Sequence, residues 1–304
     1  AYYSDYRGTA RELCATALRG FLYQGQRSSW QKQRRGRAFR GLARRRLVTY
    51  LENHDQVANS LDGHRLWQGT HPGRHRALTA LLLLGPWTPM LFQGQEWSSA
   101  APFLYFADHE PELAAKVRAG RAEFLSQFPS CRAADAEGRL ADPASPATAE
   151  ASRLRWEELE SDRAQKSLAL HRELLALRRE DPLFARILAG GEEPHVEGAL
   201  LGDHSFVLRY FDEDEVGDRL LVVNLGPQEA CCPVPEPLVA APRGHRLAVL
   251  WSSEDPRYGG LGTPWVPDDL SWPAESALLL GFVPEDEGNV PSRYLRARNQ
   301  EVAS

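Results

Sequence analysis

Two patterns of hydrophobic and polar positions divide this chain. Up to about residue 180, short apolar runs alternate with stretches whose apolar residues recur every three or four positions, the spacing of an amphipathic helix. Beyond residue 200, short strand-like runs are separated by turns rich in Asp, Gly and Pro, which is typical of antiparallel strands. The pattern therefore predicts an α/β part followed by an all-β part.

The first part alternates helices with buried strands. A helix opens at the capping box Thr9–Glu12 and places Leu13, Ala17, Leu18 and Phe21 on one face. Further helices are expected over 74–84, 111–128 and 161–180, strands over 47–51 and 90–92, and a loop over 130–150. Asp181-Pro182 is expected to end the last of these helices. Helix, strand, helix, strand predicts the last part of a TIM (β/α)8 barrel, about two βα units.

The second part contains four strand-like runs, over 205–211, 219–224, 247–251 and 277–283. Their spacing predicts an antiparallel β domain, which we expect to be a sandwich. The domain division follows from these patterns. Residues 1–185 form the C-terminal part of the barrel with its closing helices, 186–284 form the β domain, and 285–304 form a tail.

Composition narrows the class of protein. Of the 304 residues, 42% are hydrophobic and 25% are charged, and no window approaches the roughly 18 apolar residues of a membrane helix. The polar N-terminus lacks the pattern of a signal peptide. The cysteines (Cys14, Cys131, Cys231, Cys232) show no metal-binding spacing, and the adjacent pair Cys231-Cys232 is too strained to bridge. Reduced thiols, a cytoplasmic location, and no metal, cofactor or membrane partner are therefore expected.

A basic run extends from Lys32 to Arg46 and raises the alternative of nucleic-acid binding. The chain as a whole carries a formal charge of −5, and no aromatic-rich platform for single strands accompanies the arginines. We therefore interpret the run as a solvated surface, and we expect no nucleic-acid partner.

Polar residues that are candidates for a reactive site come directly after two of the predicted strands. Asn53, His54, Asp55 and Gln56 come after the first strand, and Gln95-Glu96-Trp97 come after the second. The carboxyl ends of parallel barrel strands are where enzymes of this architecture place their reactive groups.

Three segments carry a resemblance to a known family: LENHDQVAN, LLLLGPWTPMLFQGQEW and APFLYFADHEPELAAKVRAGRAEF. They resemble the α-amylase superfamily (family 13 glycoside hydrolases) and, within it, the hydrolases that release trehalose from maltooligosyltrehalose. The run PFLYF-x-DH is the narrowest of these signatures, and AYYSDY, GFLYQGQRSSWQ and the helix from LRWEEL to LALRREDP also fit. The resemblance implies an α-1,4-glucan substrate, cleaved at the bond next to a terminal trehalose unit. Gln95 departs from the family, which usually has a carboxylate there.

The resemblance also assigns roles to residues. Retaining glycosidases use a nucleophilic and an acidic carboxylate, and this superfamily adds a third that stabilises the transition state. Asp55 matches the third carboxylate, and His54 matches a histidine that bonds sugar hydroxyls. Substrate binding is further expected of Asn53, Gln56, Glu96, Trp97 and Asp108.

Each assignment has a structural alternative. Asp55 is alternatively a loop or helix cap, and Asp108 a cap for the helix that follows. Taken by itself, His54 is alternatively a structural histidine. Glu96 and Trp97 either line the cleft or close the barrel floor. The aromatic residues of the PFLYF run either stack on sugars or pack in the core.

The remaining catalytic groups are missing. No Gly-x-Arg-x-Asp segment for the nucleophile occurs, and only two of eight barrel strands are found. We therefore expect the rest of the barrel upstream in the same polypeptide, and no activity from this chain alone. The alternatives are a glucan-branching or debranching enzyme of the same superfamily, and a non-catalytic carbohydrate-binding or scaffold module.

Overall fold

A computed structural model describes residues 2–128, 131, 140–189, 193–230, 236–263 and 270–286, without the side chains of residues 2 and 3. The Cys231-Cys232 pair and the tail from residue 287 lie outside these residues. The helices are α1 (Ala10–Arg19), α2 (His54–Ala58), α3 (Pro72–Leu84), α4 (Pro111–Leu125), α5 (Pro146–Ala151), α6 (Asp162–Glu180) and α7 (Pro182–Ala189). The strands are β1 (Val48–Thr49), β2 (Thr88–Pro89), β3 (Val196–Leu200), β4 (Ser205–Tyr210), β5 (Arg219–Asn224), β6 (Glu229–Ala230), β7 (His245–Ser252), β8 (Ser271–Trp272) and β9 (Ser276–Pro284).

Contacts gather the chain into two compact units, each discontinuous in sequence. The turn unit comprises Ala1–Ser4, Tyr50–His71 and Met90–Leu168. The sheet unit comprises Asp5–Thr49, Pro72–Pro89 and Ala169–Ser304. We describe each unit by itself.

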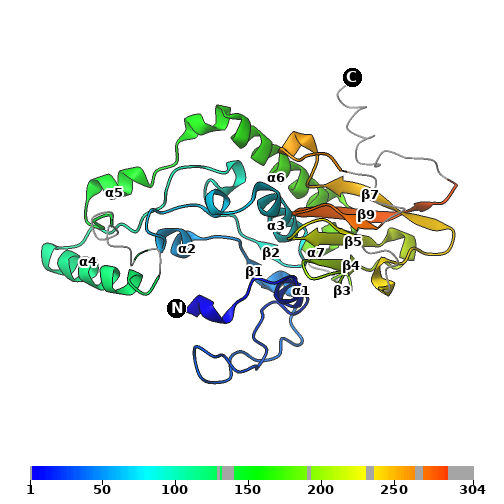
Figure 1. Cartoon of the computed structure of the whole chain (residues 1–304), viewed down its shortest axis with the longest axis horizontal. Helices are drawn as coiled ribbons and strands as arrows, with labels where there is room; N and C mark the ends of the chain where they lie inside the picture. Colours follow the sequence, from blue (N-terminus) through cyan, green and yellow to red (C-terminus); the bar gives the residue numbers. More distant parts are fainter. Residues whose placement is uncertain are drawn as a thin grey trace. The chain divides into compact units, whose positions relative to one another are not determined.

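The sheet unit is built on an antiparallel sheet with the strand order β3-β4-β5-β9-β7 (Figure 1). This confirms the predicted antiparallel region, and the four predicted strands correspond to β4, β5, β7 and β9. The pattern did not predict β3, whose sequence VEGAL contains a charge and a glycine and so lacks a strand-like run. A small second sheet pairs β6 with β8.

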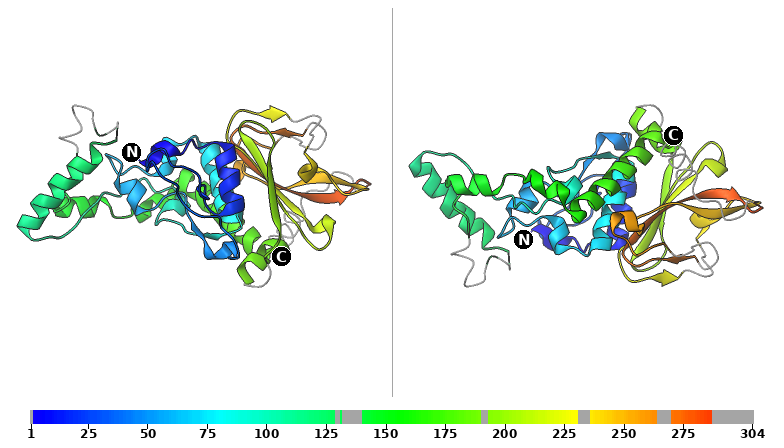
Figure 2. Two further views of the ribbon diagram at one scale, coloured as in Figure 1. Left: turned by 90° about the horizontal axis from the view of Figure 1, so that it is seen from below. Right: turned by 90° about the horizontal axis from the view of Figure 1, so that it is seen from above.

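Both faces of the main sheet are covered within the sheet unit. One face carries a hydrophobic cluster made of Val207, Leu220, Val222, Val239, Leu247, Trp272, Leu278, Leu280 and Phe282. The opposite face meets helices: α1 lies against β3 and β4, and α3 lies against β5 and β9 (Figure 2). The Tyr210 hydroxyl donates to the Leu84 carbonyl over 2.8 Å, which ties the sheet to the end of α3. Coverage of both faces explains why every residue of β4 is buried.

Helix α1 confirms the predicted start and part of the predicted face. The Thr9 hydroxyl accepts the Glu12 amide, and the Glu12 carboxylate accepts the amides of Arg7 and Gly8. The buried residues of α1 are Ala10, Cys14 and Ala17, and Phe21 is exposed. The small side chains allow a close approach, because a Cβ added to Gly198 of β3 would lie only 3.2 Å from the Cys14 sulfur. Burial raises the pKa of that thiol to about 11.

The predicted strand–helix–strand connection is present. Strands β1 and β2 pair in parallel, with Val48 opposite Thr88, and α3 lies between them in sequence. Each strand is only two residues long, and β2 precedes the apolar run 90–92 in which the second strand was expected.

Three short helices were not predicted, and α2 (His54–Ala58) is one of them. Asp181 does end α6, but its carboxylate then accepts the Leu183 and Phe184 amides and so opens α7 with Pro182 in the first turn. Within the expected loop 130–150, α5 begins at Pro146, whereas residues 132–139 lie outside the described part.

Candidate functional site

The Asn53–Gln56 segment forms a tightly capped turn in the turn unit. The Asn53 carboxamide oxygen accepts the amides of Asp55 (2.8 Å) and Gln56 (3.4 Å). The Gln56 side chain accepts the Asn53 amide over 3.0 Å, which completes a reciprocal capping box at the start of α2. Asn53 and Gln56 therefore use their polar side chains to hold the backbone of this turn.

His54 and Asp55 point outward from the same turn. Their side chains are 66% and 68% exposed, and the His54 Nε2 lies 3.4 Å from an Asp55 carboxylate oxygen. The alternative that Asp55 caps the helix is wrong, because Asn53 is the N-cap residue. The carboxylate of Asp55 is thus presented to solvent on a fixed backbone.

Directly before this turn, Glu52 belongs to a buried ion pair that the sequence patterns did not indicate. Glu52 is 4% exposed, and its carboxylate accepts the Leu66 amide over 2.6 Å and lies 3.8 Å from Arg65. Burial raises the pKa of Glu52, while the Leu66 amide and Arg65 act in the opposite direction. The available signal was a carboxylate directly after an apolar strand run, a position where burial forces pairing.

The second predicted cluster lies on a single 3-10 turn, Gln95–Trp97. Trp97 is buried, and its ring packs against Trp156 with centroids 5.1 Å apart. Gln95 is also buried, and its side-chain oxygen accepts the Phe92 amide over 3.2 Å. The half-buried Glu96 accepts the Ser167 hydroxyl through its main-chain carbonyl.

Several polar atoms around this turn are buried without a hydrogen-bond partner among the described residues. They are Arg65 Nη2, Gln95 Nε2, Glu96 Oε2 and Trp97 Nε1. Burial lowers the pKa of Arg65, and the charges of Glu52, Glu158 and Glu96 partly oppose this, so Glu96 lies within electrostatic reach of the guanidinium. Such atoms are normally satisfied by water or by a ligand.

Asp108 and the nearby aromatic residues occupy the approach to α4. Asp108 is exposed, and the alternative that it caps α4 is wrong, because Glu110 stands at that position. Phe103 bridges Phe92 and Phe106, at centroid distances of 5.2 and 6.0 Å. Phe106 itself remains 43% exposed.

All seven predicted site residues thus belong to the turn unit. Within it, the structure brings Asn53, His54, Asp55 and Gln56 together on one turn. Among the described residues, no hydrogen bond or ion pair joins this turn to the side chains of Glu96, Trp97 or Asp108.

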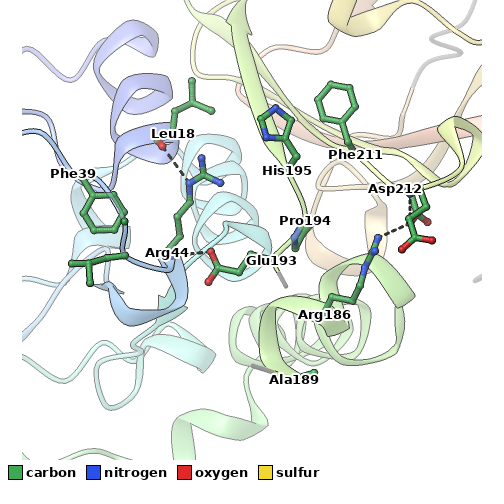
Figure 3. Close-up of a pocket in the computed structure, with 13 residues that line it drawn as sticks. Leu18, Phe39, Arg44, Arg186, Ala189, Glu193, Pro194, His195, Phe211 and Asp212 are labelled. Atoms are coloured by element: carbon green, nitrogen blue, oxygen red, sulfur yellow. Dashed lines mark hydrogen bonds and ion pairs between the residues drawn. The ribbon is translucent and has the colours of Figure 1, made fainter. Parts of the chain in front are cut away.

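The sheet unit contains a hollow of about 820 Å³ that includes none of these residues (Figure 3). Its charged groups bond to protein groups: the Arg44 side chain donates to the Leu18 carbonyl, Arg186 pairs with Asp212, and Glu193 accepts the amides of Arg44 and Arg45. The side chains of Arg44, Arg186, Asp212 and Glu193 are thus engaged by the protein itself.

The described part of the chain contains neither a metal-binding cluster nor a membrane-spanning helix. No group of three or more His, Cys, Asp or Glu side chains is placed to hold a metal ion. None of the described helices combines the length and the apolar character needed to cross a membrane.

Residues 195–279 match the family "Domain of unknown function (DUF3459)". A malto-oligosyltrehalose trehalohydrolase of Deinococcus radiodurans is 36% identical over 229 residues, which cover 74% of this chain and 36% of that protein. One of Arthrobacter ramosus is 38% identical over 60% of this chain and 31% of its own length.

A solved structure from Salmonella typhimurium, described as a candidate alpha amylase, superposes with a TM-score of 0.71 at 27% identity. The match covers 92% of this chain and 43% of that one. The chain spans about a third of the length of these curated relatives. The chain is therefore a homologue of the malto-oligosyltrehalose trehalohydrolases over that part of their length.

Proposed function

We propose that this chain is the C-terminal part of a glycoside hydrolase that releases trehalose from maltooligosyltrehalose by cleaving the adjacent α-1,4-glucosidic bond. Residues 1–185 contribute about the last two βα units of a (β/α)8 barrel, and 186–284 contribute a β-sandwich domain. The catalytic nucleophile and the general acid come from the polypeptide upstream. The homology to named trehalohydrolases supports the reaction.

The proposal rests on one observation: the Asp55 carboxylate is exposed on a fixed backbone. Its backbone is fixed by a capping box formed by two neighbours, while its carboxylate stays exposed next to His54. A carboxylate that does not hold its own turn can act on a ligand. Held rigidly, it stabilises the positive charge that develops on the sugar ring in the transition state.

The other predicted site residues have different roles in this proposal. His54 bonds sugar hydroxyls beside Asp55, and Glu96 and Asp108 supply further polar contacts. Asn53 and Gln56 act on the substrate mainly by shaping the turn, because their side chains form its capping box. Trp97 supports the site from within the core of the turn unit.

The test replaces Asp55 with Asn in the gene product that carries these 304 residues. Loss of the charge at an unchanged shape should lower kcat for trehalose release by at least about 10²-fold, because the charge acts in the transition state. The melting temperature should barely change, since the side chain is exposed. Near-normal turnover would remove Asp55 from the catalytic residues.

A matched variant separates the chemistry from the fold. Asn53→Ala removes the cap and should lower the free energy of unfolding by about 1 kcal/mol, whereas Asn53→Asp should retain it. The 304-residue chain by itself should release no trehalose above background. Enzyme-like release by that chain would contradict the assignment of nucleophile and acid to upstream residues.

A further inference from the structure

Arg121 of α4 makes three contacts that converge within the turn unit. Its guanidinium donates to the Asn59 side-chain oxygen over 3.3 Å and to the Ala58 carbonyl. The same group lies over the Tyr105 ring, 4.6 Å from the ring centroid. Ala58 is the last residue of α2 and Asn59 is its C-cap, so Arg121 binds the end of the helix opposite to Asp55.

Helix α2 needs such a contact because it is very short. It spans only five residues, and helices of this length do not persist without tertiary anchors. The capping box holds its N-terminus, but the carbonyls of a last helical turn lack partners within the helix. A cation at this end bonds to those carbonyls and favours the negative end of the helix dipole.

The chemistry of the contact requires an arginine. The planar guanidinium forms two hydrogen bonds at its edge while its face stacks on an aromatic ring. A lysine ammonium at the same place has the charge but neither the fork nor the flat face. Arg121 therefore links the end of α2 to Tyr105, which is 38% exposed.

We propose that Arg121 is a positioning residue for the reaction: by holding the C-terminal end of α2, it sets the orientation of the turn that presents Asp55, and it fixes Tyr105 beside the same helix. This inference rests on the proposed function, because it gives Arg121 a role only through Asp55. Arg121 itself touches no reacting atom in this proposal.

The test compares three variants of the gene product that carries these residues: Arg121→Met, Arg121→Lys and Arg118→Met. Arg118 lies on the same helix but pairs with Asp142, so its loss controls for removing a cation from α4. Amide hydrogen exchange is measured at Val57, Asn59 and Ser60, whose amides donate to carbonyls of residues 53–57. Trehalose release is measured in parallel.

We expect Arg121→Met to accelerate exchange at these amides by at least about 10-fold through local opening. It should lower kcat by about 10- to 100-fold, the size expected for a misplaced catalytic group. KM should change less than kcat. Arg121→Lys should be intermediate, and Arg118→Met should resemble the parent protein.

Two outcomes would overturn the inference. One is the absence of either expected change in Arg121→Met: unchanged exchange in α2, or unchanged kcat despite faster exchange there. The other is a uniform rise that includes the buried amides of α3, since that would show general unfolding. If the parent protein releases no trehalose, the proposed function fails, and the exchange measurement still reports separately whether Arg121 holds α2.

Discussion

Exposure separates the residues that can carry chemistry from those that hold the chain. Glu52 and Asp55 are carboxylates three positions apart, yet Glu52 is buried against Arg65 and Asp55 faces solvent. A buried carboxylate has to be paired, so the side chain of Glu52 serves to hold the fold. Asp55 keeps its charge available because Asn53 performs the capping.

Burial also decides the charge of a histidine in α3. Burial lowers the pKa of His75 to about 4, and His171 and Arg76 add repulsion. The unfolded chain binds this proton more readily, with a pKa near 6.5. The free energy of unfolding should therefore fall as the pH decreases from about 6.5 to about 4, by on the order of 3 kcal/mol, and this contribution should be constant below that range.

Denaturant titrations between pH 4 and pH 7 would measure this effect. His75→Gln should reduce the slope of stability against pH relative to the parent chain, and His71→Gln, which alters an exposed histidine next to the same helix, serves as the control. Equal slopes for His75→Gln and the parent would show that His75 is not the group responsible.

The ends of helices depend on hydrogen bonds from distant residues. The hydrophobic pattern predicts α3, but it does not predict which group donates hydrogen bonds to the carbonyls at the C-terminus of α3. Arg178 of α6 does so: its guanidinium donates to the carbonyls of Leu83 (2.7 Å), Gly85 (2.8 Å) and Trp87. One buried side chain, 91 to 95 positions further along the chain than its partners, thus supplies the hydrogen-bond donors at the end of α3.

Arg178→Met should lower the free energy of unfolding by about 3 kcal/mol or more, because it leaves several buried carbonyls without donors. Arg178→Lys should cost less, since an ammonium retains some of these bonds. The neighbouring Arg179 is exposed and pairs with Glu180, so Arg179→Met should stay within about 0.5 kcal/mol of the parent. Equal melting curves for the variants at 178 and 179 would contradict this account.

Contacts within a unit also join residues that lie far apart in the sequence. In the sheet unit, Arg76 of α3 donates to both carboxylate oxygens of Glu254, at 2.8 and 2.9 Å, and to the Ser253 carbonyl. The partners are 178 positions apart and both are buried. The pair ties α3 to the residues that follow β7.

Glu254→Gln should destabilise the sheet unit by about 3 kcal/mol, because it leaves the Arg76 charge buried without compensation. Replacing both Arg76 and Glu254 with Met should cost less than the sum of the single variants Arg76→Met and Glu254→Met, since the double change removes both desolvation penalties. A double-mutant cycle by chemical denaturation measures this coupling. Additive costs would mean that the two side chains do not interact in solution.

Most local elements and the candidate turn can be predicted from the amino-acid sequence. Periodicity located the long helices and four strands of the sheet, and Asn53 to Gln56 stood out because strongly polar residues follow an apolar strand run. These features depend on neighbours within a few positions, which one sequence displays directly. The sequence pattern does not predict the short helix α7 or strand β3. Pro182 indicates the end of the preceding helix, and VEGAL shows no alternation of apolar and polar residues.

Contacts between distant segments determine which polar residues hold the fold and which stay exposed. Asn53 took the cap that Asp55 was a candidate for, Trp97 proved to be buried, and Arg65 and Arg121 acquired roles through residues between 13 and 63 positions away. Burial and long-range pairing depend on which segments meet in space, and no local pattern encodes those meetings. Local preference thus places the turn, whereas packing determines that the Asp55 carboxylate stays exposed while that of Glu52 is buried.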